Sequence, residues 1–213
     1  TKHKWESDRY FNFGYVKYLP KDFDENKKYP LVFFLHGAGE RGEDIEKIKA
    51  HGIPKLFSRD QDYGGLRVVT LSPQCPDERT WYDFKWDVIA LIDEVAEKYN
   101  VDKSKITLCG ISMGGFGTWE IGLQVPEKFA AIAPICGGGM GWRAWYLRNT
   151  PIRVYHGKLD DLVPLCMSET MVEAVRSHGG NVEFVIYDDL YHDCWTRAFE
   201  QTDLIAWLAN SQK

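Results

Sequence analysis

Long apolar runs and basic tracts are both absent from this sequence of 213 residues. No stretch approaches the roughly 18 consecutive apolar residues that a transmembrane helix requires. The 31 acidic and 26 basic residues are scattered along the chain, so the net charge of -5 leaves no basic patch for nucleic acid. We therefore predict no membrane span and no nucleic-acid partner. The composition is typical of a soluble chain, either cytoplasmic or secreted after loss of a signal peptide.

Cysteine is also scarce, which excludes several kinds of site. The five cysteines are an odd number, and they lack both the paired spacing of a zinc site and the density of a disulfide framework. There is no helical His-Glu-x-x-His pattern and no Gly-Lys-Ser/Thr signature of a phosphate loop. We predict no metal, no organic cofactor and no bound nucleotide. Cys109 and Cys136 fall in apolar segments as small buried residues, whereas Cys194 lies two residues after His192.

Two periodicities alternate along the chain and predict the fold class. Short runs rich in β-branched and aromatic residues predict strands over residues 10–19, 31–35, 68–71, 106–109, 131–135, 152–155 and 183–187. Apolar stripes of helical spacing predict helices over residues 86–99, 116–123, 167–177 and 198–208. This alternation is typical of an α/β protein, with a mostly parallel sheet and helices on both faces. The length fits a single domain over residues 1–213.

The most informative motif lies at the junction between a predicted strand and a predicted helix. Residues 110–114 read Gly-Ile-Ser-Met-Gly, with Ser112 at the centre. A sharp turn at this junction presents a serine hydroxyl at the strand end, and the flanking glycines leave room for the neighbouring backbone. The helix that begins there directs free N–H groups toward the same point, which suits an oxygen that becomes negative. We predict Ser112 as the nucleophile of acyl transfer.

Three further motifs accompany the serine motif. Residues 35–42 read Leu-His-Gly-Ala-Gly-Glu-Arg-Gly, residues 156–164 read His-Gly-Lys-Leu-Asp-Asp-Leu-Val-Pro, and residues 191–195 read Tyr-His-Asp-Cys-Trp. Over residues 10–208 the chain resembles the α/β-hydrolase superfamily, and within it the small carboxylesterases, dienelactone hydrolases and "predicted peptidases", a branch that includes feruloyl and acetyl esterases. The resemblance implies a Ser, Asp, His order along the chain and a site with little or no lid.

The base and the acid are predicted from their places between elements. A serine hydroxyl needs a neutral imidazole to accept its proton, and His192 lies in the loop between the last strand and the last helix. Asp160 and Asp161 both follow the strand over residues 152–155, and the resemblance selects Asp160. The other candidates are predicted as turn residues (Asp188 and Asp189), loop-packing residues (His36 and His156) and surface residues (His3, His51 and His178).

The remaining site residues surround the predicted nucleophile. The backbone N–H groups of Met113 and Ala38 are predicted to form the oxyanion hole. Arg41 is predicted either to contact the substrate or to form a salt bridge within its loop. Four of the eight tryptophans are predicted as aromatic walls for an acyl group, with core packing as the alternative: Trp81, Trp142, Trp145 and Trp195.

Together these residues predict a serine carboxylesterase. Its predicted substrates are short-chain or aromatic acyl esters, as small molecules or attached to plant polysaccharide. Two alternatives stay open. The same catalytic residues attack amides and thioesters, so a peptidase, an acyl-thioesterase or a lysophospholipase is one of them. A non-catalytic binding module that has kept the fold is the other, because a fold alone does not prove activity.

Overall fold

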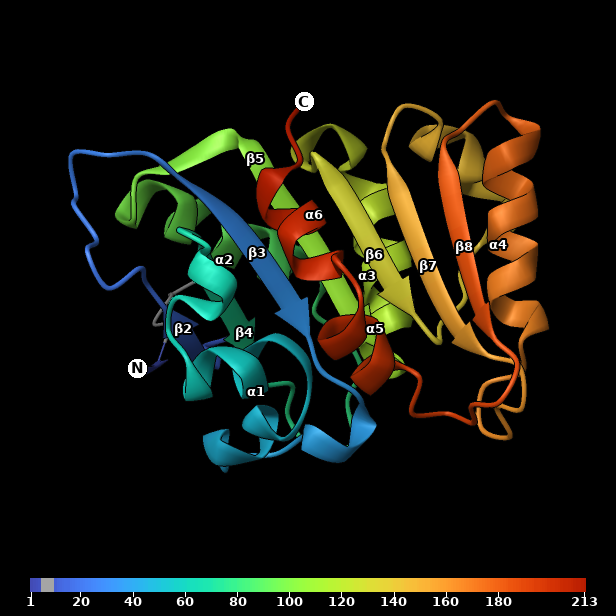
Figure 1. Ribbon diagram of the computed structural model, residues 1–213, viewed down its shortest axis with the longest axis horizontal. Coiled ribbons are helices and arrows are strands. Elements are labelled where there is room, and N and C mark those ends of the chain that lie inside the picture. Colours follow the sequence, from blue (N-terminus) through green and yellow to red (C-terminus); the bar gives the residue numbers. More distant parts are fainter. Residues whose placement is uncertain (5–9) are drawn as a thin grey trace.

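A mostly parallel sheet of eight strands forms the centre of the computed structural model, which describes residues 1–4 and 10–213 (Figure 1). The strands lie in the order β1-β2-β4-β3-β5-β6-β7-β8. Their bounds are β1 Lys2–Lys4, β2 Gly14–Tyr18, β3 Tyr29–Leu35, β4 Val69–Pro73, β5 Val101–Ile111, β6 Ala131–Ile135, β7 Ile152–Gly157 and β8 Val182–Tyr187. Only the β1–β2 and β2–β4 pairs are antiparallel. The predicted α/β class is confirmed.

Helices cover both faces of this sheet. The α-helices are α1 Gly52–Arg59, α2 Lys85–Lys98, α3 Met113–Gln124, α4 Cys166–Ser177, α5 Trp195–Gln201 and α6 Leu204–Asn210. In Figure 1, α5 and α6 cross in front of the sheet while α2 and α3 lie behind it. No helix in the described part of the chain has both the length and the apolar character to cross a bilayer.

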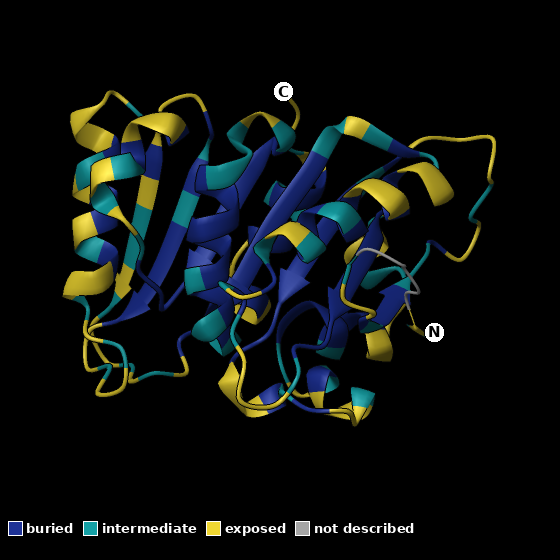
Figure 2. Ribbon diagram, turned by 180° about the vertical axis from the view of Figure 1, so that it is seen from behind, coloured by how far each residue is buried: buried dark blue, intermediate teal, exposed yellow. Residues whose placement is uncertain are grey.

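Strand β3 shows why both faces must be covered. Successive side chains of a strand point to opposite faces of the sheet. Leu31, Phe33 and Leu35 belong to the apolar cluster that includes residues of α2, α3 and α4. Val32 and Phe34 belong to the second cluster, with residues of α1, α5 and α6. All five side chains are fully buried, and Figure 2 shows the same burial along the central strands. A continuous apolar run therefore marks a strand covered on both sides.

The structure corrects two predicted elements. The strand predicted over residues 10–19 is shorter, because Phe13 packs against the rings of Trp81 and Phe84 instead of pairing within the sheet. The helix predicted over residues 198–208 is two helices. Thr202 leaves the helical conformation at φ -126 and ψ 176, and its hydroxyl accepts the Leu204 N–H at 3.1 Å. This local bond from side chain to backbone favours the non-helical conformation that separates the two helices.

The connections after β6 leave the carboxyl edge of the sheet uncovered by any inserted domain. Residues 136–151 link β6 to β7 and contain only the short helix η5 (Gly141–Leu147), while the link from β7 to β8 contains α4. These are the only helices between those strands in the described ranges. The fold therefore agrees with the prediction of little or no lid.

Leu108→Ala tests the importance of the central strand for stability. Leu108 lies in β5 and is fully buried, so we expect the variant to lose about 2–5 kcal/mol of unfolding free energy. The matched control is Met140→Ala in an exposed loop, with an expected change of about 0.5 kcal/mol or less. Denaturant unfolding measures both values. Equal losses in the two variants would show that β5 does not lie at the centre of the core.

Candidate active site

Ser112 occupies a sharp turn between β5 and α3. Strand β5 ends at Ile111 and α3 begins at Met113, so Ser112 alone reverses the chain direction. Its backbone lies at φ 52 and ψ -117, a region that non-glycine residues rarely adopt. A bond from the Ser112 N–H to the Ile135 carbonyl, at 2.9 Å, holds this conformation. The hydroxyl is thereby presented at the carboxyl edge of the sheet, as the sequence predicts.

The flanking glycines are required by the close approach of α3 to the strands. A Cβ added to Gly110 would lie 2.3 Å from the Gly114 carbonyl oxygen. A Cβ added to Gly114 would lie 2.0 Å from the Leu35 carbonyl oxygen. Both distances are far inside normal contact, and the obstacle is backbone that cannot rotate away. Glycine is therefore the one residue type that permits this packing.

The structure brings the three predicted catalytic residues together. His192 Nε2 lies 2.8 Å from Ser112 Oγ, and His192 Nδ1 lies 2.7 Å from Asp160 Oδ2. Because an ionised carboxylate only accepts, Nδ1 carries the ring proton and Nε2 accepts the serine O–H. The residues come from the turn after β5, the loop after β7 and the loop after β8. Each distance is within the range for a nucleophile, base and acid.

Asp160 is buried but fully hydrogen-bonded. Its side chain has no exposed surface, and Oδ1 accepts the N–H groups of Leu162 and Val163 at 3.0 and 2.8 Å. Burial acts to raise the pKa of this carboxyl. The hydrogen bonds from His192, Val163 and Leu162 outweigh burial, so its pKa lies below the ordinary value of 3.8. Asp160 therefore stays ionised beside the imidazole at neutral pH.

The alternative acids do not reach the imidazole. Asp188 forms an ion pair with Lys158 at 2.8 Å, and Asp189 pairs with Arg197 at 2.8 Å. Asp161 is exposed next to Asp160. All three lie on the outside of their loops, which matches the prediction that they are not the primary acid.

Two helix starts lie beside Ser112. Ala38 is the first residue of the short helix η1 (Ala38–Glu40), and Met113 is the first residue of α3. The first N–H of a helix has no acceptor within the helix, so both amides are available to a ligand. The η1 turn is fixed by a bond from the Gly37 N–H to Glu40 Oε2 at 2.8 Å. A Cβ added to Gly37 would lie 3.6 Å from Ser112 Cβ, so this turn adjoins the serine.

Arg41 braces the η1 turn. Its Nε donates to the Ala38 carbonyl at 2.9 Å, and a terminal nitrogen donates to the Arg79 carbonyl at 3.2 Å. Both acceptors are backbone carbonyls, so the predicted loop salt bridge is replaced by bonds to the main chain. The guanidinium thereby fixes the orientation of the Ala38 peptide.

Of the four tryptophans predicted as aromatic walls, Trp195 contacts a predicted catalytic residue. The Trp195 ring packs edge-on against His192, with centroids 5.1 Å apart, and is 9% exposed. The prediction for Trp81 is wrong: the ring is fully buried and its Nε1 donates to the His36 carbonyl. The prediction for Trp145 is also wrong. This ring shares a hollow with residues that precede β6 and β7, at the edge of the sheet opposite Ser112. Trp142 is 78% exposed on the same short helix η5 as Trp145.

His36 supports the start of the η1 turn. Its Nδ1 donates to the Gly37 carbonyl at 2.6 Å, and its Nε2 accepts the Cys75 N–H at 2.9 Å. These partners require the neutral ring, and burial lowers the pKa of His36 to about 4. His156 braces the Asp160 loop in a similar way, because its Nε2 donates to the Val163 carbonyl at 2.9 Å. Both agree with the prediction of histidines that pack and shape loops.

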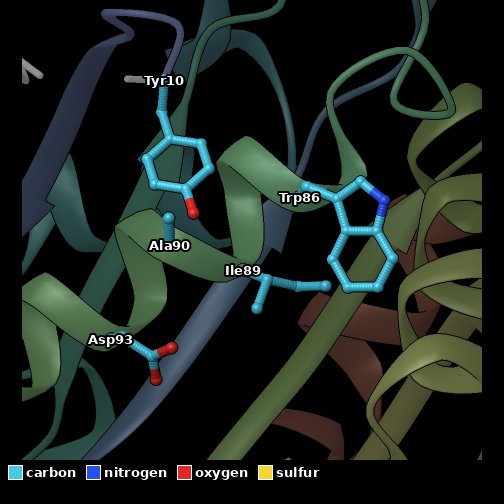
Figure 3. Close-up of a pocket in the computed structure, with 5 residues that line it drawn as sticks. All are labelled: Tyr10, Trp86, Ile89, Ala90 and Asp93. Carbon is cyan, nitrogen blue, oxygen red and sulfur yellow. The ribbon is translucent and has the colours of Figure 1, made fainter. Parts of the chain in front are cut away.

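Two other features of the structure do not compete with this site. Within the described residues, Cys136, Asp160 and His192 place possible metal-ligand atoms within 4.8 Å of one another, but Asp160 and His192 are bonded to each other. A hollow of about 590 Å³ lies along α2 and is lined by Tyr10, Trp86, Ile89, Ala90 and Asp93 (Figure 3). It contains none of the predicted catalytic residues.

The fold and the arrangement at Ser112 define an α/β hydrolase. The chain belongs to the phospholipase/carboxylesterase family, whose model matches residues 67–206. This confirms the predicted superfamily and, at the level of the family, the predicted class of carboxylic ester hydrolase. A crystal structure of a thermostable esterase superposes with a TM-score of 0.89 at 30% identity, covering 100% of this chain and 63% of that one.

Two curated relatives are more distant. The bifunctional acetylxylan esterase/xylanase XynS20E of Neocallimastix patriciarum is 28% identical over 154 residues, which is 68% of this chain. Dipeptidyl-peptidase 5 of Porphyromonas gingivalis is 24% identical over 234 residues, which is 82% of this chain. The chain spans 21% and 32% of the lengths of these two relatives.

The lowered pKa of His36 predicts a stability change with pH. The folded ring titrates at about 4 and the unfolded ring near 6.5, so the unfolded chain binds more protons between these values. We expect unfolding free energy to fall as pH decreases from 6.5 toward 4, with no further His36 contribution below that. In an NMR titration of ring signals, assigned with His36→Gln, the His36 midpoint should lie near 4. A midpoint near 6.5 would contradict the buried neutral ring.

Proposed function

We propose that this chain is a serine carboxylesterase that uses Ser112 as nucleophile, His192 as general base and Asp160 as the orienting acid. The observation that carries the proposal is the continuous hydrogen-bonded line from Ser112 Oγ through both imidazole nitrogens to a buried carboxylate. Ser112 attacks the ester carbonyl while His192 Nε2 takes its proton. The resulting imidazolium lies against the ionised Asp160, which stabilises its charge.

The negative oxygen of the tetrahedral intermediate needs donors that are already oriented. In this proposal the Met113 and Ala38 amides supply them, at two helix starts on either side of the serine. His192 then protonates the departing alcohol, and the acyl group stays on Ser112. Water, deprotonated by the same imidazole, releases the acid and restores the serine. Each amide of this kind contributes about 3 kcal/mol to lowering the barrier.

The proposed substrates are short-chain or aromatic acyl esters, including those on plant polysaccharide. Exposed apolar side chains flank the acid and the base in sequence: Leu159 is 44% exposed, Leu162 71% and Tyr191 61%. Such a rim can contact a flat acyl group without enclosing it, and an open site admits a polymer-linked ester. The similarity to an acetylxylan esterase supports the same class of substrate.

A peptidase is the second candidate, because a dipeptidyl-peptidase is among the relatives. Ester, thioester and amide substrates with one common acyl group distinguish these functions, since the chemical steps are shared and only leaving-group protonation differs. We expect the ester to be turned over fastest. Faster turnover of the amide would favour the peptidase. Failure of a fluorophosphonate probe to modify folded protein would favour a binding module.

Ser112→Ala tests the proposed nucleophile. We expect kcat on p-nitrophenyl acetate to fall by about 10⁴-fold or more, because no other group can form the acyl intermediate. The matched control is Ser177→Ala, an exposed serine near the end of α4, which should keep kcat within about twofold. Circular dichroism establishes that both variants fold. Comparable rates in wild type and Ser112→Ala would remove the assignment.

Tyr191→Ala tests the aromatic part of the proposed specificity. We expect kcat/KM for feruloyl esters to fall about tenfold, the equivalent of one lost aromatic contact, while acetyl esters change by less than about twofold. Trp86→Ala is the control, because Trp86 is 53% exposed on α2 in the hollow of Figure 3. The panel also includes butyryl and long-chain esters. Preferential turnover of long-chain esters by the wild type would contradict the proposed acyl preference.

A further inference from the structure

Two buried cysteines lie in contact behind the imidazole of His192. Cys136 follows β6, and Cys194 lies two residues after His192, immediately before α5. Their sulfur atoms are 2.9 Å apart, and both residues are fully buried. A disulfide bond measures about 2.05 Å, so a movement of less than about 1 Å would bring the two sulfurs to bonding distance.

Cys136 adopts a backbone conformation that non-glycine residues rarely adopt. Cys136 lies at φ 49, in the left-handed region that favours glycine, and the residues that follow it are glycines. A bond from its N–H to the Tyr155 carbonyl, at 2.9 Å, fixes this conformation. The thiol is thereby directed toward the turn that carries the base, with Sγ 3.2 Å from the His192 carbonyl oxygen.

Both cysteines contact the turn that carries His192. The His192 carbonyl accepts the Cys194 N–H at 2.9 Å as well as the Cys136 thiol. Both cysteines therefore contact the same peptide group of the base. A covalent link between them would replace these thiol contacts with a fixed connection from the end of β6 to this turn.

We propose that Cys136 and Cys194 form a disulfide when the chain folds in the presence of a small disulfide oxidant such as glutathione disulfide. One cysteine thiolate attacks a glutathione sulfur and releases one glutathione. The second cysteine then attacks the mixed disulfide and releases the other. In sum, two protein thiols are oxidised to one S–S bond, and one glutathione disulfide is reduced to two glutathione molecules.

Burial determines when this exchange takes place. Exchange requires a thiolate that the oxidant can reach, and burial raises the pKa of the Cys136 thiol well above its ordinary value. The bond therefore forms before the His192 loop closes over the pair. Once the loop has closed, the same burial protects the bond from reductants. A bond across 58 residues restricts the unfolded chain over a long loop, which stabilises the folded state.

The other three cysteines provide an internal comparison. Cys75 and Cys109 are buried and Cys166 is exposed, and none of them has a second sulfur within hydrogen-bonding distance. A selective reaction at Cys136 and Cys194 is therefore distinguishable from general oxidation. The proposed disulfide involves thiols alone, so thiol mapping can confirm or contradict it independently of the proposed ester hydrolysis.

The direct test is thiol mapping of the wild-type chain. Protein refolded from denaturant with a glutathione redox buffer, and protein refolded with a phosphine reductant, are each alkylated after denaturation and digested. We expect the oxidised sample to contain one peptide pair linked through Cys136 and Cys194, with a mass loss of about 2 Da, while Cys75, Cys109 and Cys166 are alkylated. Alkylation of both Cys136 and Cys194 in oxidised, folded protein, or a link involving another cysteine, would overturn the proposal.

Thermal unfolding of variants supplies a second measurement. For oxidised samples we expect Cys136→Ser, Cys194→Ser and the double variant to share the same decrease in Tm, about 5 °C or more, because each lacks the same bond. Cys166→Ser is the matched control and should retain the wild-type Tm. Wild type refolded with reductant should fall toward the variants. Additive losses in the double variant, or an identical Tm for oxidised and reduced wild type, would contradict a shared bond.

Discussion

The close packing of the first turn of α3 against the ends of β3 and β5 is the constraint on which the site depends. It forces Ser112 into a backbone conformation at φ 52, and it leaves room for nothing larger than glycine at Gly110 and Gly114. Strain of this kind persists because the surrounding sheet and helix fix the backbone on both sides. The same packing places the first amide of α3 beside the serine hydroxyl, so the proposed nucleophile and one proposed oxyanion donor are positioned by one turn.

Burial and hydrogen bonding together determine which groups of the site are charged and which are neutral. Asp160 has no exposed side-chain surface, yet amide and imidazole donors hold it ionised. His36, which is also buried, lacks an anionic partner and is held neutral between a carbonyl and an amide. These opposite outcomes follow from the partners, because burial alone disfavours the charged form of both groups. The buried Asp160 therefore carries a fixed negative charge, whereas the buried, neutral His36 supports the η1 turn.

Sequence reasoning identified what is encoded locally. The serine turn could be predicted because its glycines, the preceding strand and the following helix are contiguous. Asp160 and Asp161 both fitted the acid by position, and the resemblance to the α/β hydrolases selected Asp160. The exposure of individual tryptophan side chains could not be predicted in this way. Trp81 lies in a loop by sequence, but its indole is buried against His36, and Trp145 lies at the edge of the sheet opposite Ser112. Both outcomes depend on tertiary packing between segments far apart in the chain.

The contact between Cys136 and Cys194 could not be predicted from the sequence either. Fifty-eight positions separate them, and the packing of α5 against the sheet brings their sulfurs together. Likewise, α5 and α6 are divided at Thr202, whose backbone is extended and whose hydroxyl accepts the Leu204 N–H, within a segment whose apolar period is continuous. Periodicity detects a helical segment, but not the residue at which it is divided.

Covalent acylation of Ser112 can be observed by mass spectrometry of rapidly acid-quenched protein after mixing with excess p-nitrophenyl acetate. We expect a pre-steady-state burst approaching one equivalent of p-nitrophenol, together with one acetyl group on the peptide containing Ser112. An acetyl group on another residue, or full turnover by protein in which Ser112 is never acylated, would contradict it.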